Sequence, residues 1–209
     1  MLSGITLDFL SQLIGEKLQS PVSSLNYVRI SGGSINDTYK LTANKTQFFF
    51  LKVNSSQRFP ALFEKEKSGL EFLGEQNIIR TPQITGDGIT GDDQWLLMEW
   101  IEPGAKTKAF WKIFGEQLAL LHQTSNSHFG FTENNYMGAL QQTNTHSKNW
   151  IDFFIRFRLQ PQIQLARNKG LLTQNNVSSF EKLYTKLNVI FIQENASLLH
   201  GDLWILYVM

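Results

Sequence analysis

The tripeptide His200-Gly201-Asp202 lies near the end of the chain and directly follows an apolar pair, Leu198-Leu199. Kinase-type catalytic loops begin in this way, with a strand that ends in a turn and an Asp side chain held toward a substrate hydroxyl. The same tripeptide also occurs in ordinary turns. A catalytic role for Asp202 therefore depends on whether the other parts of a phosphoryl-transfer site come earlier in the sequence.

Two glycines, Gly32 and Gly33, followed by Ser34, separate the strand-like segments 25–30 and 38–41. Glycines in such a connection permit backbone paths that side chains would block, and they leave amide N–H groups free to face an anion. The alternative is a plain hairpin turn. The pattern thus predicts a β-hairpin whose connection is either a simple turn or a phosphate-binding loop.

A single lysine, Lys52, lies near the end of a strongly β-prone apolar segment, residues 48–53. A Lys within an apolar strand is unfavourable unless it has a partner. A helix predicted to start near Pro60 carries Glu64 and Glu66 in its first two turns. A strand Lys paired with a helix Glu holds nucleotide phosphates in kinase-like small lobes. The alternative for Lys52 is an edge-strand side chain whose ammonium reaches water.

Residues 95–101 are mostly apolar and predict a buried strand, which the Glu-Pro-Gly turn at 102–104 ends. Residues 80–93 before it predict a short strand and a turn-rich hairpin. A buried strand that leads into a turn between lobes is where an adenine ring would bind to the backbone. We therefore expect a nucleotide-binding lobe at residues 1–103 and a helical lobe at residues 104–209.

Helical periodicity predicts further elements that position these residues. The predicted helices comprise residues 7–18, the segment that starts near Pro60, and residues 109–122, 150–169 and 176–193. Pro161 should kink or divide the fourth of them. Residues 123–149 are expected to form a long loop.

The composition excludes several classes of protein. The chain has 209 residues, 42% hydrophobic and 18% charged, and a net charge of +1, which suits a soluble globular protein of one domain or two small lobes. The absence of a Lys/Arg run argues against nucleic acid or membrane as a partner. The sequence contains no cysteine, no recognisable signal peptide and no apolar run long enough to span a membrane, so we expect a cytoplasmic protein.

Taken together, the motifs resemble the fructosamine kinase (ketosamine-3-kinase) family, whose relatives include aminoglycoside and choline kinases. The resemblance extends over nearly the whole chain. The matching segments are residues 32–36, 50–54, 63–66, 69–70, 98–99, 129–130, 135–138, 149–154, 158–162 and 199–204. The Trp150-x-x-Phe-Phe segment and Trp204 are the most specific, because they separate this family from the aminoglycoside kinases.

The resemblance implies an α+β, protein-kinase-like fold of two lobes, a small antiparallel β-sheet lobe and an incomplete helical lobe. It implies ATP- and Mg²⁺-dependent phosphorylation of the sugar 3-hydroxyl of ketosamines, either small molecules or glycated proteins, as a deglycation step. The implied catalytic base is Asp202. The implied nucleotide-binding residues are Gly32, Gly33, Ser34, Lys52, Glu66, Met98, Glu99, Trp100 and Ile101. Glu66 is preferred to Glu64 as the partner of Lys52 because Gly69-Leu70 follows it at the family's spacing.

The chain departs from the family pattern after Trp204. The family continues with Ser-Gly-Asn, whose Asn binds magnesium, whereas this chain has Tyr207 at that position and Met209 as its last residue. A phenol is a poor magnesium ligand, so we assign no metal-binding residue. We expect a truncated family member with impaired activity and an exposed apolar patch. Two alternatives remain: a nucleotide-binding remnant without catalysis, and a kinase for another small alcohol such as an aminoglycoside.

Overall fold

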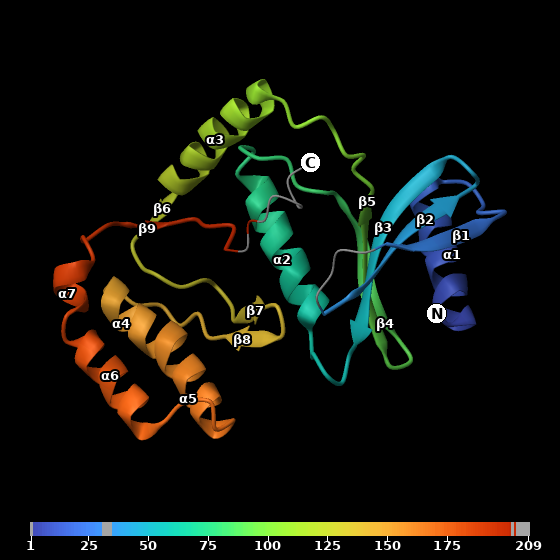
Figure 1. Ribbon diagram of the computed structural model, residues 1–209. Helices are drawn as coiled ribbons and strands as arrows, with labels where there is room; N and C mark the ends of the chain where they lie inside the picture. The colour runs from blue at the N-terminus through green and yellow to red at the C-terminus, as the bar shows by residue number, and fades with distance from the viewer. Residues whose placement is uncertain (1, 31–34, 202, 204–209) are drawn as a thin grey trace. The chain divides into compact units, whose positions relative to one another are not determined.

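The computed structural model describes residues 2–30, 35–201 and 203 (Figure 1). The predicted site residues Gly32, Gly33, Ser34 and Asp202 lie outside this part of the chain. The described residues divide into two compact units, the first formed by the residues up to Gln117 together with Leu203 and the second by Leu118–Gly201.

The first unit is built on a five-stranded antiparallel sheet with the strand order β1-β2-β3-β5-β4. Its strands are β1 (Leu25–Ile30), β2 (Asp37–Ala43), β3 (Gln47–Ser55), β4 (Ile84–Thr90) and β5 (Asp93–Glu99). Each strand is antiparallel to its neighbours. This sheet, together with the helices, confirms the predicted α+β class.

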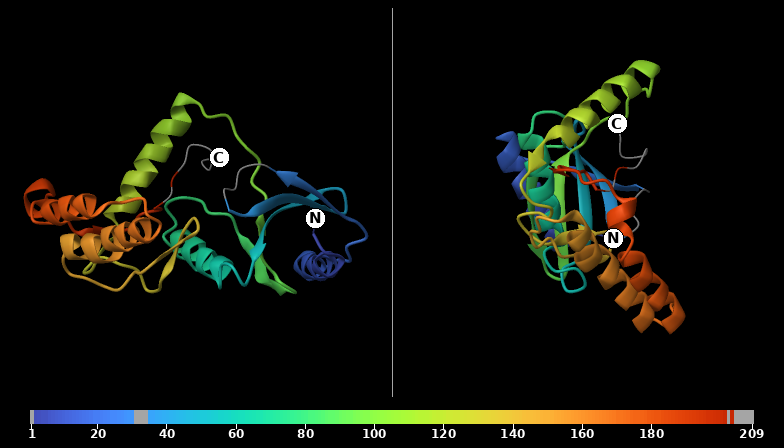
Figure 2. Two further views of the ribbon diagram at one scale, coloured as in Figure 1. Left: turned by 60° about the horizontal axis from the view of Figure 1, so that its bottom comes forward. Right: turned by 90° about the vertical axis from the view of Figure 1, so that its left-hand side faces the viewer.

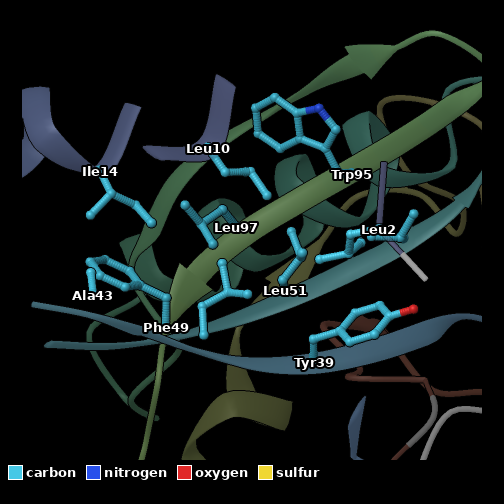
Figure 3. Close-up of a cluster of buried hydrophobic side chains, with 11 residues drawn as sticks. Leu2, Leu10, Ile14, Tyr39, Ala43, Phe49, Leu51, Trp95 and Leu97 are labelled. Atoms are coloured by element: carbon cyan, nitrogen blue, oxygen red, sulfur yellow. The ribbon is translucent and has the colours of Figure 1, made fainter. Parts of the chain in front are cut away.

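Helix α1 (Gly4–Leu18) covers one face of the sheet and forms the main core (Figure 3). Ser3 begins the helix, since its Oγ accepts the Thr6 amide at 3.1 Å. Leu10 and Ile14 are fully buried against the sheet. Successive strand side chains point to opposite faces, and the core side chains of β2, β3 and β5 all have odd residue numbers. They are Tyr39, Leu41, Ala43, Phe49, Leu51, Val53, Trp95 and Leu97.

Helix α2 (Leu62–Glu75) lies on the opposite face of the sheet from α1 (Figure 1). The helix was predicted to start near Pro60, and it starts two residues later, at Leu62. A turn precedes the helix, because the Leu62 amide donates to the Phe59 carbonyl at 3.2 Å and Ala61 has a left-handed φ of 57°. Phe63, which is 1% exposed, then anchors the first turn of α2 in the core.

Strand β4 corrects a second prediction, since it passes through a glycine-rich segment that was expected to form the turn. Two glycines permit this path. A Cβ at Gly88 would lie 2.7 Å from the Trp95 ring, and one at Gly86 would lie 2.9 Å from Leu13 of α1. The glycines therefore allow the strand to pass close to bulky core side chains.

Helix α3 (Lys108–Gln123) contains the division between the two units. In the second unit, β6 (Ser125–Asn126) pairs with β9 (Ala196–Ser197). The predicted long loop was wrong in part, because it contains a hairpin of β7 (Asn135–Met137) and β8 (Leu140–Gln142). Its strands have only three residues each, too few for a clear alternating pattern.

The second unit also contains two helical segments, residues 150–168 and 174–184, that lie side by side (Figure 2). The predicted helix 150–169 is α4 (Trp150–Phe154), a π-helical turn at Ile155–Leu159 and α5 (Gln160–Asn168). Pro161 has no N–H to donate, and the π-helical turn directly before it adapts the helix to that loss. The predicted helix 176–193 was too long: α6 (Gln174–Tyr184) ends early, and only the short α7 (Leu187–Ile190) follows. No helix within the described ranges is long and apolar enough to cross a membrane.

Candidate functional site

The face of the sheet opposite α1 carries the polar side chains that the sequence singled out. The strand register places Lys40, Phe50 and Met98 in one row across β2, β3 and β5. Lys52 lies in the next row, between Thr38 and Leu96. The predicted phosphate-binding lysine and the start of the predicted adenine linker therefore share one face of one sheet.

Lys52 forms an ion pair with Glu66 of α2. Both side chains are mostly buried, with exposed fractions of 24% and 26%. Glu64, the other candidate, is 63% exposed and contacts the neighbouring Lys65 at 3.2 Å instead. The ion pair supplies the partner that a lysine within an apolar strand requires, and it directs the Lys52 ammonium toward α2.

The segment after β5 was predicted to be an adenine-binding linker. Met98 is 3% exposed, and the Glu99 amide donates to the Gln83 carbonyl at 2.8 Å. The Glu99 carboxylate pairs with Arg80 and is therefore turned toward residues 80–83. Residues 100–104 have no backbone–backbone hydrogen bond within the described part of the chain. Their main-chain groups, including those of Trp100 and Ile101, are available to a ligand.

Lys40 and Glu102 were not among the predicted site residues. Glu102 belongs to the linker, and Lys40 contacts the linker from β2. Lys40 Nζ lies 3.0 Å from Glu102 Oε1 and 4.1 Å from the centre of the Trp100 ring. Trp100 Nε1 donates to the same Glu102 oxygen at 2.7 Å. The hydrogen bond from Lys40, and to a smaller extent that from Trp100, lowers the pKa of Glu102. The alternation of β2 placed Lys40 on the polar face, but only the folded chain shows what it contacts.

Asn54, two residues after Lys52, joins β3 to the beginning of β2. Its Nδ2 donates to the Ile35 carbonyl at 2.9 Å and to Asn36 Oδ1 at 2.7 Å. The sequence motifs contained Asn36 and Asn54, but no contact between them was predicted. The amide pair fixes residues 35 and 36 beside the strand that carries Lys52.

In the second unit, the strand before the His-Gly-Asp tripeptide is held by a hydrogen bond from the Leu198 amide to the Thr124 carbonyl, at 2.9 Å. Gly201 has a φ of +86°, a conformation that favours glycine. The chain therefore turns after this strand, as the catalytic-loop interpretation requires. Asp202 itself is outside the described residues, so its role stays a prediction.

A buried polar cluster holds the helices and the loop of the second unit together. Arg158 donates to the Thr143 carbonyl at 2.8 Å and to Asn144 Oδ1 at 2.5 Å, and burial lowers the pKa of its guanidinium. Asn144 is 4% exposed and donates to the Glu133 carbonyl at 2.9 Å. This cluster is structural. No group of three His, Cys, Asp or Glu side chains suited to a metal ion occurs in the described ranges.

Comparison with known proteins supports one family over almost the whole chain. The sequence model of the fructosamine kinase family matches residues 7–208. A probable ketoamine kinase of Synechocystis is 32% identical over 198 residues, which cover 93% of this chain and 65% of the relative. A probable ketoamine kinase of Enterococcus faecium is 36% identical over 182 residues, which cover 85% of this chain and 62% of the relative.

Solved structures agree with the sequence comparison. A crystal structure described as that of a fructosamine-3-kinase from Haemophilus somnus superposes with a TM-score of 0.81 at 26% identity. The match covers 94% of this chain and 65% of that chain. The likeness confirms the predicted kinase-like fold. The chain spans just under two thirds of the length of the Synechocystis and Enterococcus proteins.

Proposed function

The chain belongs to the fructosamine kinase family, and we propose that it acts as an ATP-dependent ketoamine kinase. The observation that carries this proposal is the Lys52–Glu66 ion pair on the sheet face that also bears Met98. A nucleotide requires both a cation for its phosphates and a linker for its base. This face carries the cation and ends at the linker.

In this proposal, the Lys52 ammonium binds the α- and β-phosphates of ATP, and Glu66 holds that ammonium in place. Hydrogen bonds between ionised groups are roughly twice as strong as neutral ones, so this contact contributes much of the affinity for the phosphates. Glycines 32 and 33 and Ser34 complete the phosphate site. The Glu99 amide already donates to Gln83, so the main-chain groups of Trp100 and Ile101 bind the adenine, and the Met98 side chain packs beside it.

The transfer step requires a base for the attacking hydroxyl, and we assign that role to Asp202. Its carboxylate accepts the proton of the sugar 3-hydroxyl as the oxygen attacks the γ-phosphorus of ATP and ADP leaves. A positioned base of this kind contributes about 10²–10⁴-fold to the rate. Asp202 and Tyr207 lie outside the described residues. Tyr207 stands where the family has its magnesium-binding Asn, so the use of magnesium is expected from the family alone and no residue is assigned as its ligand.

The proposed substrates are ketosamines, as free small molecules or on glycated proteins, and the proposed product is the 3-phosphate. The names of the relatives, ketoamine kinase and fructosamine-3-kinase, support this class. Phosphorylation at that position would begin a deglycation reaction. The observations on the described residues favour no other phosphate acceptor.

Two measurements test this proposal on the 209-residue chain. Calorimetric titration with ATP should show binding that Lys52→Met weakens and that Lys67→Met, which removes the lysine paired with Asp87, leaves unchanged. With fructosyl-lysine and an aminoglycoside offered as separate acceptors, radiolabelled γ-phosphate from ATP should be transferred to fructosyl-lysine, and this transfer should be lost in Asp202→Asn. Magnesium is supplied in both measurements.

Each outcome decides between the alternatives. Binding with transfer to fructosyl-lysine supports the ketoamine kinase. Binding with transfer only to an aminoglycoside or another small alcohol contradicts the substrate class. Binding without any transfer contradicts catalysis and favours a nucleotide-binding remnant. Absence of ATP binding contradicts the proposal as a whole.

A further inference from the structure

Lys40 contacts a carboxylate and two aromatic rings. Its ammonium lies 3.0 Å from Glu102 Oε1, and its distances to the ring centres of Trp100 and Phe48 are 4.1 and 4.4 Å. Its side chain is 27% exposed. A lysine free in solvent makes no such set of contacts, because holding its long side chain still loses rotamer entropy.

Lys40 of β2 and the linker residues Trp100 and Glu102 all contact one another. Trp100 Nε1 and Lys40 Nζ both donate to the same oxygen of Glu102, at 2.7 and 3.0 Å. The Trp100 ring also packs near Phe50, with ring centres 6.3 Å apart. We call Lys40, Trp100 and Glu102 the linker clamp. The clamp joins strand β2 to two residues of a segment that has no secondary structure of its own.

The linker depends on such side-chain contacts. Within the described part of the chain, residues 100–104 form no backbone–backbone hydrogen bonds, so neither a sheet nor a helix holds them. A main chain that is to bind a planar base must already lie in the correct path, because ordering it during binding would lower the affinity. The clamp contacts fix residues 100 and 102 through their side chains and leave their main-chain groups free.

We infer that Lys40 is a positioning residue for nucleotide binding, which holds the linker through Trp100 and Glu102 so that its backbone can bind the base. This inference rests on the proposed function, because it assigns the base to the linker. It predicts that the clamp contributes to the binding of the base and not to the binding of the phosphates. Loss of the clamp should weaken interactions with the base and leave those with the phosphates unchanged, since Lys52 and Glu66 lie outside the clamp.

The test compares two probes, ATP and inorganic triphosphate, which has the phosphates but no base. Lys40→Met retains the apolar stem and removes the charge. It should raise the Kd for ATP about two- to fivefold, as expected for loss of a cation–π contact and of an ion pair whose carboxylate is 67% exposed. The Kd for triphosphate should stay the same. Glu102→Gln, at a 67% exposed position that cannot disturb the core, should act in the same direction.

A matched control and a salt series sharpen the test. Lys67→Met removes a different lysine–carboxylate pair, that with Asp87 at 2.9 Å, and should leave both affinities unchanged. Raising the salt concentration screens exposed ion pairs, so the difference between the unaltered chain and Lys40→Met should become smaller. Thermal unfolding of each variant shows whether it is folded, and Glu102→Gln carries the test if Lys40→Met does not fold.

The results separate this inference from the proposed function. If the unaltered chain binds neither ATP nor triphosphate, the proposed function and the inference are both overturned. If the chain binds ATP and the two clamp variants bind ATP equally well, only the inference is overturned. Equal weakening of ATP and triphosphate would also overturn it, because a general structural role predicts that result. Weakening of ATP alone supports it.

Discussion

The ion pair between Lys52 and Glu66 allows a quantitative test of how the proposed phosphate site is held. Both side chains are about three quarters buried. Exposed ion pairs contribute about 0–1 kcal/mol, whereas removing one partner of a fully buried pair costs about 3–5 kcal/mol. For this intermediate burial we expect Lys52→Met and Glu66→Gln each to lower the free energy of unfolding by about 1–2 kcal/mol. The corresponding decrease in Tm is about 2–8 °C for a chain of this size.

The effect on ATP binding should differ between the two variants. Lys52→Met removes a charge-assisted hydrogen bond to phosphate, worth about 1.5–3 kcal/mol, so the Kd for ATP should rise about 10- to 100-fold. Glu66→Gln leaves the ammonium in place but less well oriented, so we expect a smaller increase. In the double variant the Kd should equal that of Lys52→Met alone, because Glu66 acts on the nucleotide only through Lys52.

Calorimetric titration of the four proteins gives this double-mutant cycle, and denaturant unfolding gives the stabilities. Glu64→Gln is the matched control, since this residue belongs to the same helix but is 63% exposed and contacts Lys65. It should change neither quantity. The reasoning is refuted if Glu66→Gln weakens ATP binding by the same factor with and without Lys52, or if Glu64→Gln has the effect expected of Glu66→Gln.

Three further predictions concern stability. Leu51→Ala, at a fully buried core position, should lower the free energy of unfolding by about 2–5 kcal/mol in denaturant titration; a loss below about 1 kcal/mol would contradict the core described. Gly130→Ala should lower Tm, because its φ is +112° and the added Cβ would lie 2.5 Å from the Asn144 carbonyl oxygen; an unchanged Tm would refute this. The hydrogen bond from Lys67 to Asp87 raises the pKa of Lys67, so its stabilising contribution is present at neutral pH and disappears as the pH rises above about 10.4 through the raised pKa. Unfolding measured from pH 8 to 11.5 should show this loss in the unaltered chain and a smaller loss in Asp87→Asn, and equal losses would contradict it.

Local sequence patterns predicted much of the first unit. Alternation in residues 25–30, a second strand pattern in residues 38–41 and the β-prone apolar run 48–53 indicated three strands, and all three are present with slightly longer bounds for the second and third. The helix with Leu10 and Ile14 at helical spacing is also present. These predictions succeeded because each element buries one face, and a buried face leaves a period of two or about 3.6 in the sequence.

The failures occurred where the local signal was weak or pointed elsewhere. Gly86 and Gly88 suggested a turn, but both lie in a strand. Glycine is required there because a Cβ would collide with Leu13 of α1 or with the Trp95 ring. The hairpin of residues 135–142 was missed because strands of three residues show no clear alternation. The predicted helix 176–193 was too long, since its apolar spacing continues past the residue at which α6 ends.

The sequence alone indicated the family, most elements of the first unit and candidate residues for a phosphoryl-transfer site, because these depend on local patterns and motifs. Lys52 and Glu66 were paired in the prediction, but the resemblance to the family, not their spacing, selected Glu66 over Glu64. Only the tertiary structure decided that Lys40 contacts Trp100 and Glu102 across 60 and 62 positions of the chain. Such contacts depend on strand register and on the path of the linker, and neither leaves a periodic pattern in the sequence.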